Sequence, residues 1–507
     1  RLGACGAACV TRVSVAGATY RAQGALEVER QLEQARLEED HLDVAAAVAA
    51  ARRTSLFPDK RHTRPFEEAE EAAPRVLRAP CVPPHCDFEC ATHDARVERT
   101  MAADFIARDP ELSRLMHSYP EPRVCGDDAS DGTQQLGRVY PIFLGVPAED
   151  VVGCVPRKYR GFQGGVREPN AKEPERRAYR FGPDEEADYK RAYREAYFGI
   201  TKRKAGWDCL RHYEILAAGA LPFFVPEDSS EKSTSAHAIG GAPALALAHW
   251  PKQLLASFGS LFPGVDAATR SVNATLLDAD GTYARVAAGL LAYLRTRLTT
   301  TALADYVLTA SGHRDARSVL ILSSHPDPDY QRDLLIHGLR TRLGARAVDF
   351  VRPPHLYAPA PGSDDVAGTT ANSHFKANED LYGYGFTYAH RLRDDGAFAV
   401  DRSRIEQRIR DREFDVVIYA SVHRGMPFWP AVWAAYDRTE RIFVDGEDDH
   451  GWCVWSAALR WEGFYFMREL PDGCPPTLPP AQLNLSDPVH ALSFHGPFFA
   501  DDAVAFS

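Results

Sequence analysis

The sequence of 507 residues contains no uninterrupted apolar run of the length that crosses a bilayer, which is about 18 residues or more. The longest mostly apolar tract, LDVAAAVAAA at 42–51, is short, rich in alanine and flanked by charged residues. We therefore expect no transmembrane segment in this chain. The chain begins at Arg1 rather than at Met, which leaves open the possibility that a signal or anchor segment preceded it.

The chain also has fewer basic than acidic residues. The chain has 59 Lys and Arg against 70 Asp and Glu, a formal net charge of −11. Nucleic acids and anionic membranes attract clustered Lys and Arg. The balance therefore argues against nonspecific binding to nucleic acid or to an anionic membrane, and basic residues are interpreted as parts of local sites.

Paired C-x-x-C spacings are absent among the ten cysteines. Half of the cysteines lie in the first ninety residues, at Cys5, Cys9, Cys81, Cys86 and Cys90. The stretch CVPPHCDFECATH, with His85 and His93, is compatible with disulfides, with free thiols or with zinc. Two N-glycosylation sequons begin at Asn273 and Asn484. Together these features favour the secretory pathway, the Golgi lumen or the extracellular space.

Length and composition predict a globular protein with several parts. Hydrophobic residues make up 45% and charged residues 25%, as in ordinary folded domains, and the length predicts two to four domains at about 100 to 200 residues each. Residues 22–53 have helical spacing of apolar residues, and 54–95 mix proline, cysteine and charge without periodicity. We expect 1–130 to be a helical and loop extension that contains the cysteine cluster.

The rest of the chain has an α/β pattern, which we divide at residues 312 and 313. Apolar strands alternate with charged helical stretches from GRVYPIFLGVPAEDVV at 137–152 onward, and a long helical run at 283–310 closes the 131–312 part. The stretch RSVLILSSHPDPDYQRDLLIHGLRTRLGARAVDFVRPPH then reads as strand, helix and strand. FDVVIYASVHRG and ERIFVDGEDDHG repeat a buried strand followed by a polar loop, which predicts a parallel sheet in 313–507.

Polar residues follow these strands where a parallel sheet places its ligands. The loops SSHPDPD, RPPH, SVHRG and DGEDDHG should converge on one edge, because parallel strands share their direction. Their candidate catalytic bases are His325, His423, Asp445 and Glu447. The Asp445 to His450 loop could instead hold a divalent cation or cap a helix, and we leave these interpretations open.

A second candidate site lies in TKRKAGWDCLRHYEILAAGALPFFVPE, at Thr201 to Glu227. Apolar residues predict a helix from about 210, Gly219 suits its left-handed end, and Pro222 enters a buried strand. The cations before and within the helix suit a diphosphate at a helix N-terminus, and Glu214 could accept hydrogen bonds from a ribose. The alternative is a basic surface run with a helical ion pair between Arg211 and Glu214.

The spacing Glu214, Gly219, Pro222 before an apolar strand resembles the donor-nucleotide segment of GT-B glycosyltransferases. The wider run YREAYFGITKRKAGWDCLRHYEILAAGALPFF resembles exostosin-like enzymes and related algal and giant-virus proteins. The resemblance covers about 130–310 and implies two Rossmann-like domains facing a cleft. Here the donor-like motif precedes the clearer Rossmann-like unit, which leaves exchanged halves or an additional domain as alternatives.

The resemblance implies transfer of a sugar from a nucleotide-sugar donor to a hydroxyl of a glycan or glycoprotein acceptor. A divalent metal is allowed but not required. Two other functions stay open: a noncatalytic carbohydrate-binding or scaffold protein, and a metal-dependent enzyme centred on Asp445 to His450. The predicted donor-binding residues are Arg203, Lys204, Arg211, His212, Glu214 and Gly219.

Overall fold

A computed structural model describes residues 88–92, 94–124, 137–163, 181–225, 239, 242–266, 271–277, 279–358, 381–448 and 458–474. The expected helix over 22–53 and the cysteines at 5, 9, 81 and 86 lie outside these ranges, as does His93. Within these ranges no helix is long and apolar enough to cross a membrane.

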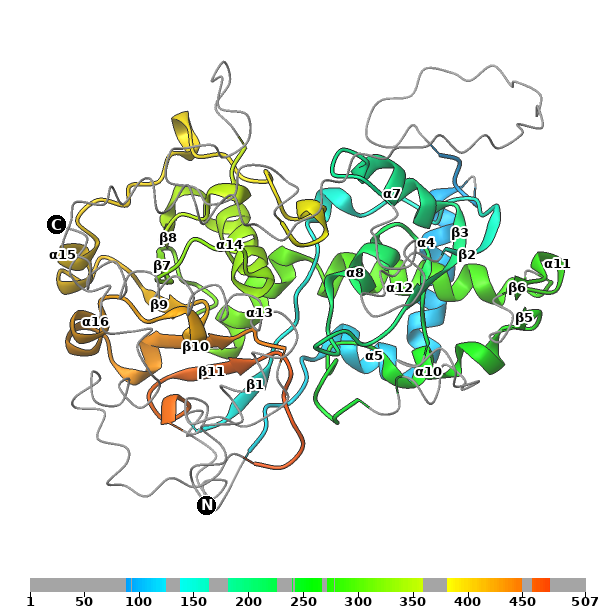
Figure 1. The fold of residues 1–507 in the computed structure, drawn as a ribbon. Helices are drawn as coiled ribbons and strands as arrows, with labels where there is room; N and C mark the ends of the chain where they lie inside the picture. Colours follow the sequence, from blue (N-terminus) through cyan, green and yellow to red (C-terminus); the bar gives the residue numbers. More distant parts are fainter. Residues whose placement is uncertain are drawn as a thin grey trace, which may run out of the picture. The chain divides into compact units, whose positions relative to one another are not determined.

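The larger sheet has six strands, all parallel to their neighbours, in the order β1-β11-β10-β9-β7-β8 (Figure 1). Its strands are β1 (Val139–Pro141), β7 (Val319–Leu322), β8 (Ala347–Phe350), β9 (Val416–Tyr419), β10 (Arg441–Asp445) and β11 (Phe464–Met467). The parallel sheet predicted for the C-terminal part of the chain is therefore confirmed, and β1 adds a strand from the 131–312 part.

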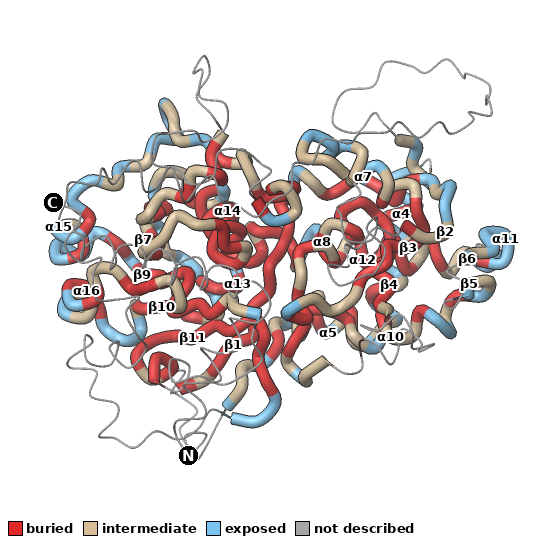
Figure 2. Tube along the Cα trace, in the orientation of Figure 1, coloured by how far each residue is buried: buried red, intermediate tan, exposed pale blue. Residues whose placement is uncertain are grey.

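Both faces of this sheet are buried, which explains its continuous apolar strands. Along β7, Val319 and Ile321 belong to one hydrophobic cluster, whereas Leu320 and Leu322 belong to another. The first face packs with α14 (Tyr330–Leu343), and the second with α15 (Ile405–Arg410) and α16 (Trp429–Ala435). Figure 2 accordingly colours the central strands as buried.

The predicted strand-helix-strand unit is formed by β7, α14 and β8. Asp329 caps α14 by accepting a hydrogen bond from the backbone N–H of Arg332. The order β8-β7-β9-β10-β11 corresponds to 2-1-3-4-5, an order of doubly wound sheets. Its direction reverses between β7 and β9, so a ligand crevice is expected at the carboxyl ends of these two strands.

A smaller parallel sheet carries the second candidate site. Its strands, in the order β2-β3-β4, are β2 (Arg160–Gln163), β3 (Ala196–Thr201) and β4 (Leu221–Phe224). Helices α7 (Glu186–Arg194), α8 (Leu210–Ala217) and α10 (Lys252–Leu261) pack with it. A short hairpin, β5 (Val265–Asp266) and β6 (Ser271–Val272), contacts β2 and precedes α11 (Ala274–Leu277).

The helical run expected over 283–310 is two helices, α12 (Thr282–Arg297) and α13 (Thr300–Ala310). Thr299 separates them, because its side chain accepts a hydrogen bond from the backbone N–H of Ala302 and so caps α13. Two further helices precede the sheets, α4 (Ala95–Arg108) and α5 (Pro110–His117), and α4 packs along α12.

A disulfide joins Cys90 to Cys154. Of the three alternatives for the cysteine-rich stretch, Cys90 therefore follows the disulfide alternative. The bond links the end of the cysteine-rich stretch to a loop 64 residues away in sequence, rather than forming a local knot. Asn273, the first sequon residue, is exposed, and Asn484 lies outside the described residues. A disulfide in the chain is compatible with an extracellular or lumenal protein.

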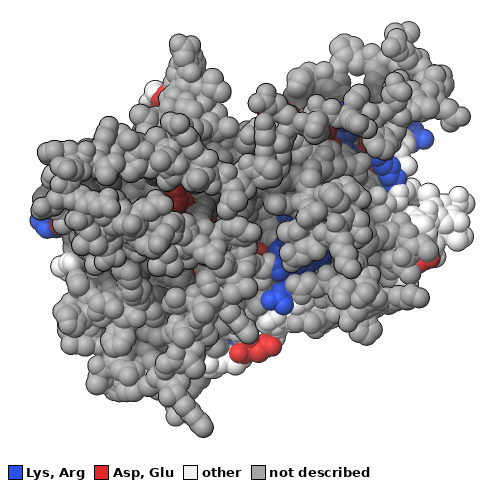
Figure 3. All heavy atoms as spheres, viewed as in Figure 1, with Lys and Arg blue, Asp and Glu red and all other residues white. Residues whose placement is uncertain are grey.

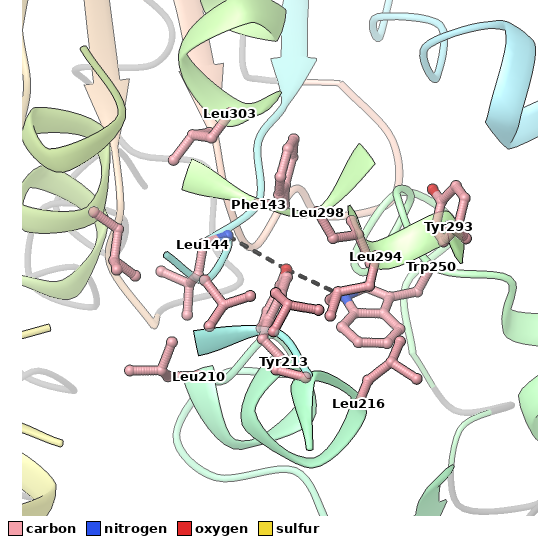
Figure 4. Packing of buried hydrophobic residues seen from close by; sticks show 14 of the residues in the cluster. Phe143, Leu144, Leu210, Tyr213, Leu216, Trp250, Tyr293, Leu294, Leu298 and Leu303 are labelled. Atoms are coloured by element: carbon pink, nitrogen blue, oxygen red, sulfur yellow. Dashed lines mark hydrogen bonds between the residues drawn. The ribbon is translucent and has the colours of Figure 1, made fainter. Parts of the chain in front are cut away.

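The two sheets share one hydrophobic cluster, which includes residues on both sides of the expected division at 312 and 313. The described residues from 88 onward belong to one compact unit, and the shared hydrophobic cluster contains Phe198 of the smaller sheet and Ile321 of the larger one. Figure 4 shows one junction, where the Tyr213 hydroxyl lies between the backbone N–H of Leu144 and the indole of Trp250. An α/β fold is established by these contacts, but a pair of separate domains is not.

Candidate functional site

The carboxyl edge of the six-stranded sheet brings two of the predicted bases together. His423 follows β9 and Asp445 ends β10, and their Nε2 and Oδ2 atoms lie 3.1 Å apart. Asp445 is buried and also accepts hydrogen bonds from the Tyr465 hydroxyl at 2.8 Å and from the backbone N–H of Glu447 at 3.3 Å. These contacts hold the carboxylate next to Nε2 of the imidazole.

The surroundings of Asp445 favour its ionised form, which can hold the His423 imidazole. Burial by itself would raise the pKa of Asp445, but His423, Tyr465 and the backbone N–H of Glu447 outweigh it and lower the pKa. Asp445 is therefore ionised at neutral pH. An ionised carboxylate that holds an imidazole orients the ring and stabilises the imidazolium that forms when the ring takes up a proton.

Glu447 lies beside this pair and has the opposite shift. Burial raises the pKa of the half-buried Glu447, His423 and Arg424 partly offset the rise, and Asp329 and Asp445 add to it. A carboxyl with a raised pKa among charged neighbours at a sheet edge is suited to proton transfer. The structure thus places three of the four predicted bases around one point.

The fourth candidate, His325, lies in the loop between β7 and α14, which is held by a buried arginine. Arg332 is fully buried and donates to the carbonyls of His325 and Asp327, each at 2.5 Å. The same guanidinium also contacts Asp333 and Ser323. These contacts fix the backbone of the loop, and the imidazole of His325 is half-buried.

An ion pair connects the loops after β7 and β9, the two strands between which the strand order reverses. Arg424, after β9, donates to Asp329 with a distance of 2.7 Å between Nε and Oδ2. Burial would raise the pKa of Asp329, yet Arg424 and Arg332 lower it to about 2. The loops after β7 and β9 are thereby tied together at the expected crevice. Asp329 and Arg424 were not among the predicted site residues, although they lie in the polar loops SSHPDPD and SVHRG.

In the smaller sheet, the loop Lys202 to Cys209 leads into α8. Lys202, Arg203 and Lys204 are half-buried, and the guanidinium of Arg203 lies 5.5 Å from the ring centre of Trp207. The predicted apolar face of α8 is buried. Lys202, Arg203 and Lys204 therefore lie partly buried in the loop before the N-terminus of α8.

His212, a predicted donor-binding residue, is fully buried. Its Nδ1 lies 2.9 Å from the Thr201 hydroxyl and its Nε2 lies 2.8 Å from the carbonyl oxygen of Trp207. Burial lowers the pKa of His212 to about 4, so the ring is neutral at physiological pH. In this position it links β3 to the loop before α8, and a contact with phosphate would need these bonds to be replaced.

Gly219 ends α8 as the sequence predicted. Its φ is +73°, and the backbone N–H groups of Gly219 and Ala220 donate to the carbonyls of Leu216 and Ile215. This pattern is a Schellman motif, in which glycine takes the left-handed position without a Cβ penalty. Gly219 directs the chain into β4, so its role in the described contacts is to shape the backbone.

Glu214, the predicted ribose ligand, is held by two hydroxyl groups. Tyr189 on α7 donates to Oε2 at 2.5 Å, and Thr387 donates to Oε1 at 2.8 Å. Burial raises the pKa of Glu214, and these two hydrogen bonds partly offset the rise. One turn earlier on α8, Nη1 of Arg211 is buried and makes no hydrogen bond to any described residue. Nothing in the sequence pointed to Thr387.

Arg468 joins the two candidate sites. It follows β11 and donates from Nη1 to the carbonyl of Asp208, in the loop before α8, at 2.5 Å. The same guanidinium donates to the carbonyl of Gly446, after β10, at 2.9 and 2.7 Å, and forms an ion pair with Asp448. The backbone N–H of Asp208 in turn donates to Glu469. The sequence signal that was missed is the Arg-Glu pair directly after the apolar strand FYFM.

The described residues contain no group of three or more His, Cys, Asp or Glu that could hold a metal ion. Asp449 and His450, which belong to the predicted metal loop, lie outside the described ranges. Figure 3 shows Lys and Arg atoms and Asp and Glu atoms in small separate patches on the face viewed. Among the residues the figure colours, this face presents no broad surface of one sign.

Comparison of the chain with protein-family models, with curated proteins and with solved structures finds no match.

Proposed function

We propose that this protein is a nucleotide-sugar-dependent glycosyltransferase. One observation carries the proposal: Arg468 holds the loop before α8 next to the loop after β10. The segment that resembles a donor-nucleotide site therefore lies beside the sheet edge that carries His423, Asp445 and Glu447. The two parallel sheets would correspond to the two Rossmann-like halves of a GT-B enzyme.

In this proposal the donor binds at the smaller sheet. Lys204, Arg203 and Arg211 would contact the diphosphate, and the buried Nη1 of Arg211 is a donor that a phosphate oxygen could satisfy. Glu214 would bind the ribose hydroxyls. Positive charge at the diphosphate stabilises the negative charge that develops on the leaving group, and such electrostatic stabilisation is often the largest contribution to catalysis.

The acceptor hydroxyl would react at the edge of the larger sheet. Its oxygen attacks the anomeric carbon, the bond from that carbon to the diphosphate breaks, and the hydroxyl proton passes to His423, which Asp445 orients. Glu447 is the second candidate for the proton acceptor. The acceptor class would be a glycan or glycoprotein, and the disulfide is compatible with a Golgi or extracellular setting.

A thermal-shift panel of UDP, GDP, ADP and CDP, with and without manganese, tests the donor site, because a ligand of the folded state raises its stability. We expect one base to raise the melting temperature of the wild type. Glu214→Gln should weaken that nucleotide by about tenfold or more, since a hydrogen bond to a charged group is lost. Glu98→Gln is the matched control, because Glu98 is a buried carboxyl that accepts from the backbone of Val155 instead.

No response to any nucleotide would reject the proposal. Oligosaccharide binding without a nucleotide response would favour a carbohydrate-binding or scaffold protein. A strict requirement for manganese that survives Glu214→Gln would favour the metal-dependent alternative at the Asp445 to His450 loop.

A further inference from the structure

Residues 381–391, called the strap here, reach from the larger sheet to the helices of the smaller one. The strap is anchored beside β8, where the backbone N–H of His390 donates to the carbonyl of His355 and that of Leu392 donates to the carbonyl of Leu356. In Figure 1 it is drawn in yellow. From this anchor the strap extends to α7 and α8.

Four contacts fasten the strap. The Thr387 hydroxyl donates to Glu214 at 2.8 Å, and the backbone N–H of the same residue donates to Glu186 at 3.0 Å. Arg391 forms ion pairs with Glu186 at 2.6 Å and with Asp150 at 3.1 Å. All of these partners except Asp150 lie on α7 or α8, and Asp150 also pairs with Lys190 of α7.

The backbone of the strap is held in an unfavourable conformation. Three of its residues other than glycine have positive φ: Tyr384 at 57°, Thr387 at 76° and His390 at 57°. A β-branched residue with positive φ is a genuine outlier. Such conformations persist only where surrounding contacts impose them, and they concentrate at ligand clamps and switch regions. The contacts to α7 and α8 therefore hold a segment that would relax on release.

The strap also contacts the carboxyl that the proposed function assigns to the ribose. The two oxygens of Glu214 each accept one hydroxyl, Oε2 from Tyr189 and Oε1 from Thr387. A carboxylate that accepts two hydroxyls, one on each oxygen, binds a vicinal diol in the same manner. Tyr189 belongs to the packed helix α7, whereas Thr387 belongs to the strained strap, so Thr387 is the hydroxyl that a ligand would replace.

We propose that the strap covers Glu214 in the ligand-free protein and that the Thr387 hydroxyl stands where a ribose hydroxyl of the donor nucleotide binds. This inference rests on the proposed function. Binding then requires the strap to leave α8, and the nucleotide competes with Thr387 for Glu214. The strap sets the apparent affinity, because only the open fraction of the protein binds.

Two variants loosen the strap in different ways. Thr387→Val removes the hydroxyl and keeps the shape, and Arg391→Gln removes the ion pairs to Glu186 and Asp150. Thr300→Val is the matched control, since the buried Thr300 hydroxyl lies 2.9 Å from Nδ1 of His337 and is remote in sequence from the strap. Circular dichroism establishes that each variant is folded.

The first measurement needs no nucleotide. Glu214 is labelled with a water-soluble carbodiimide and an amine, and the modification is quantified by peptide mass spectrometry. We expect labelling of Glu214 to rise several-fold in Thr387→Val and in Arg391→Gln, but not in Thr300→Val. Unchanged labelling in both folded strap variants would overturn the inference.

The second measurement is calorimetric titration with the nucleoside diphosphate that stabilises the wild type. We expect both strap variants to bind it about three- to tenfold more tightly, which corresponds to the loss of one competing hydrogen bond. Equal or weaker binding would contradict competition by Thr387. If no nucleotide binds any variant, the proposed function fails, and the labelling result still decides whether the strap covers Glu214.

Discussion

Asp208 is a buried carboxyl whose pKa is shifted into the neutral range. Its carboxyl is buried at the junction of the two sheets, where it accepts hydrogen bonds from the Tyr213 hydroxyl at 3.0 Å and from the backbone N–H of Leu144 at 3.2 Å. Burial raises the pKa of Asp208 to about 7, although Arg468 opposes the rise. The protonated carboxyl is therefore the form that the fold prefers below neutral pH.

The raised pKa predicts a pH dependence of stability. Between about pH 4 and pH 7 the folded chain keeps a proton on Asp208 that the unfolded chain has released. The free energy of unfolding should therefore fall as the pH rises through this window, by on the order of 1 to 4 kcal/mol, and this contribution should level off above it. Urea unfolding of the wild type and Asp208→Asn at several pH values measures it. Parallel curves for the two proteins would contradict the account.

At the level of single residues, the sequence indicated candidate side chains but not their partners. His423, Asp445 and Glu447 could be selected because they follow apolar strands, and parallel strands end at the same edge. Thr387 and Tyr189 could not, since their contacts with Glu214 span 173 and 25 residues of sequence and depend on packing between the parts. His212 was predicted to bind the donor, because the pattern of the helix does not reveal that both ring nitrogens contact protein atoms.

At the element scale, the glycine that ends α8 gives a sharp test. Gly219 and Gly312 both occupy the left-handed position of a Schellman motif, with φ of +73° and +80°. A Cβ at Gly219 would lie 2.4 Å from Cδ of Pro156, whereas nothing lies within 4 Å of a Cβ at Gly312. Gly312→Ala should cost about 1 to 2 kcal/mol of stability from backbone strain alone.

Gly219→Ala should cost about 1 to 3 kcal/mol more than Gly312→Ala, because Pro156 must also move. Chemical denaturation of both variants measures the difference. Equal losses would show that the loop around Pro156 yields without cost.

A second pair of glycines tests the contact between α13 and α14: Gly338 lies at this contact, and Gly259 serves as the control. A Cβ at Gly338 would lie 1.9 Å from the carbonyl oxygen of Thr300, so Gly338→Ala must separate the two helices. Gly259 lies within α10 with nothing in reach of a Cβ. We expect Gly338→Ala to lose about 1 to 3 kcal/mol or more, and Gly259→Ala to gain about 0.5 to 1 kcal/mol. Thermal unfolding that ranks the variants the other way would refute this packing.

Elements could be predicted where periodicity was strong. The unit β7-α14-β8 follows from an apolar strand, a polar loop and apolar residues at helical spacing. The run over 283–310 did not reveal its break, because Thr299 is a single capping residue within a helical pattern. The membership of β1 in the larger sheet could not be predicted either, since its partner β11 is more than 300 residues away.

At the scale of the whole molecule, the disulfide and the shared core tie distant parts together. The Cys90 to Cys154 bond closes a loop with a sequence separation of 64 residues. Removing it as Cys90→Ala with Cys154→Ala should lower the free energy of unfolding by about 2 to 4 kcal/mol, because the unfolded chain gains freedom. Cys209→Ser, which changes a free cysteine, is the control. A double variant as stable as the control would contradict a structural role for the bond.

In the proposed function, the loop before α8 and the carboxyl edge of the larger sheet form one transferase site. A direct test is release of nucleoside diphosphate from UDP-, GDP-, ADP- and CDP-linked sugars in the presence of mixed oligosaccharide acceptors. We predict release from one nucleotide class by the wild type, and a rate lower by about 10²- to 10⁴-fold in folded His423→Gln and Asp445→Asn. Undiminished release in both variants, or no release from any donor by the folded wild type, would show that these elements do not form a transferase site.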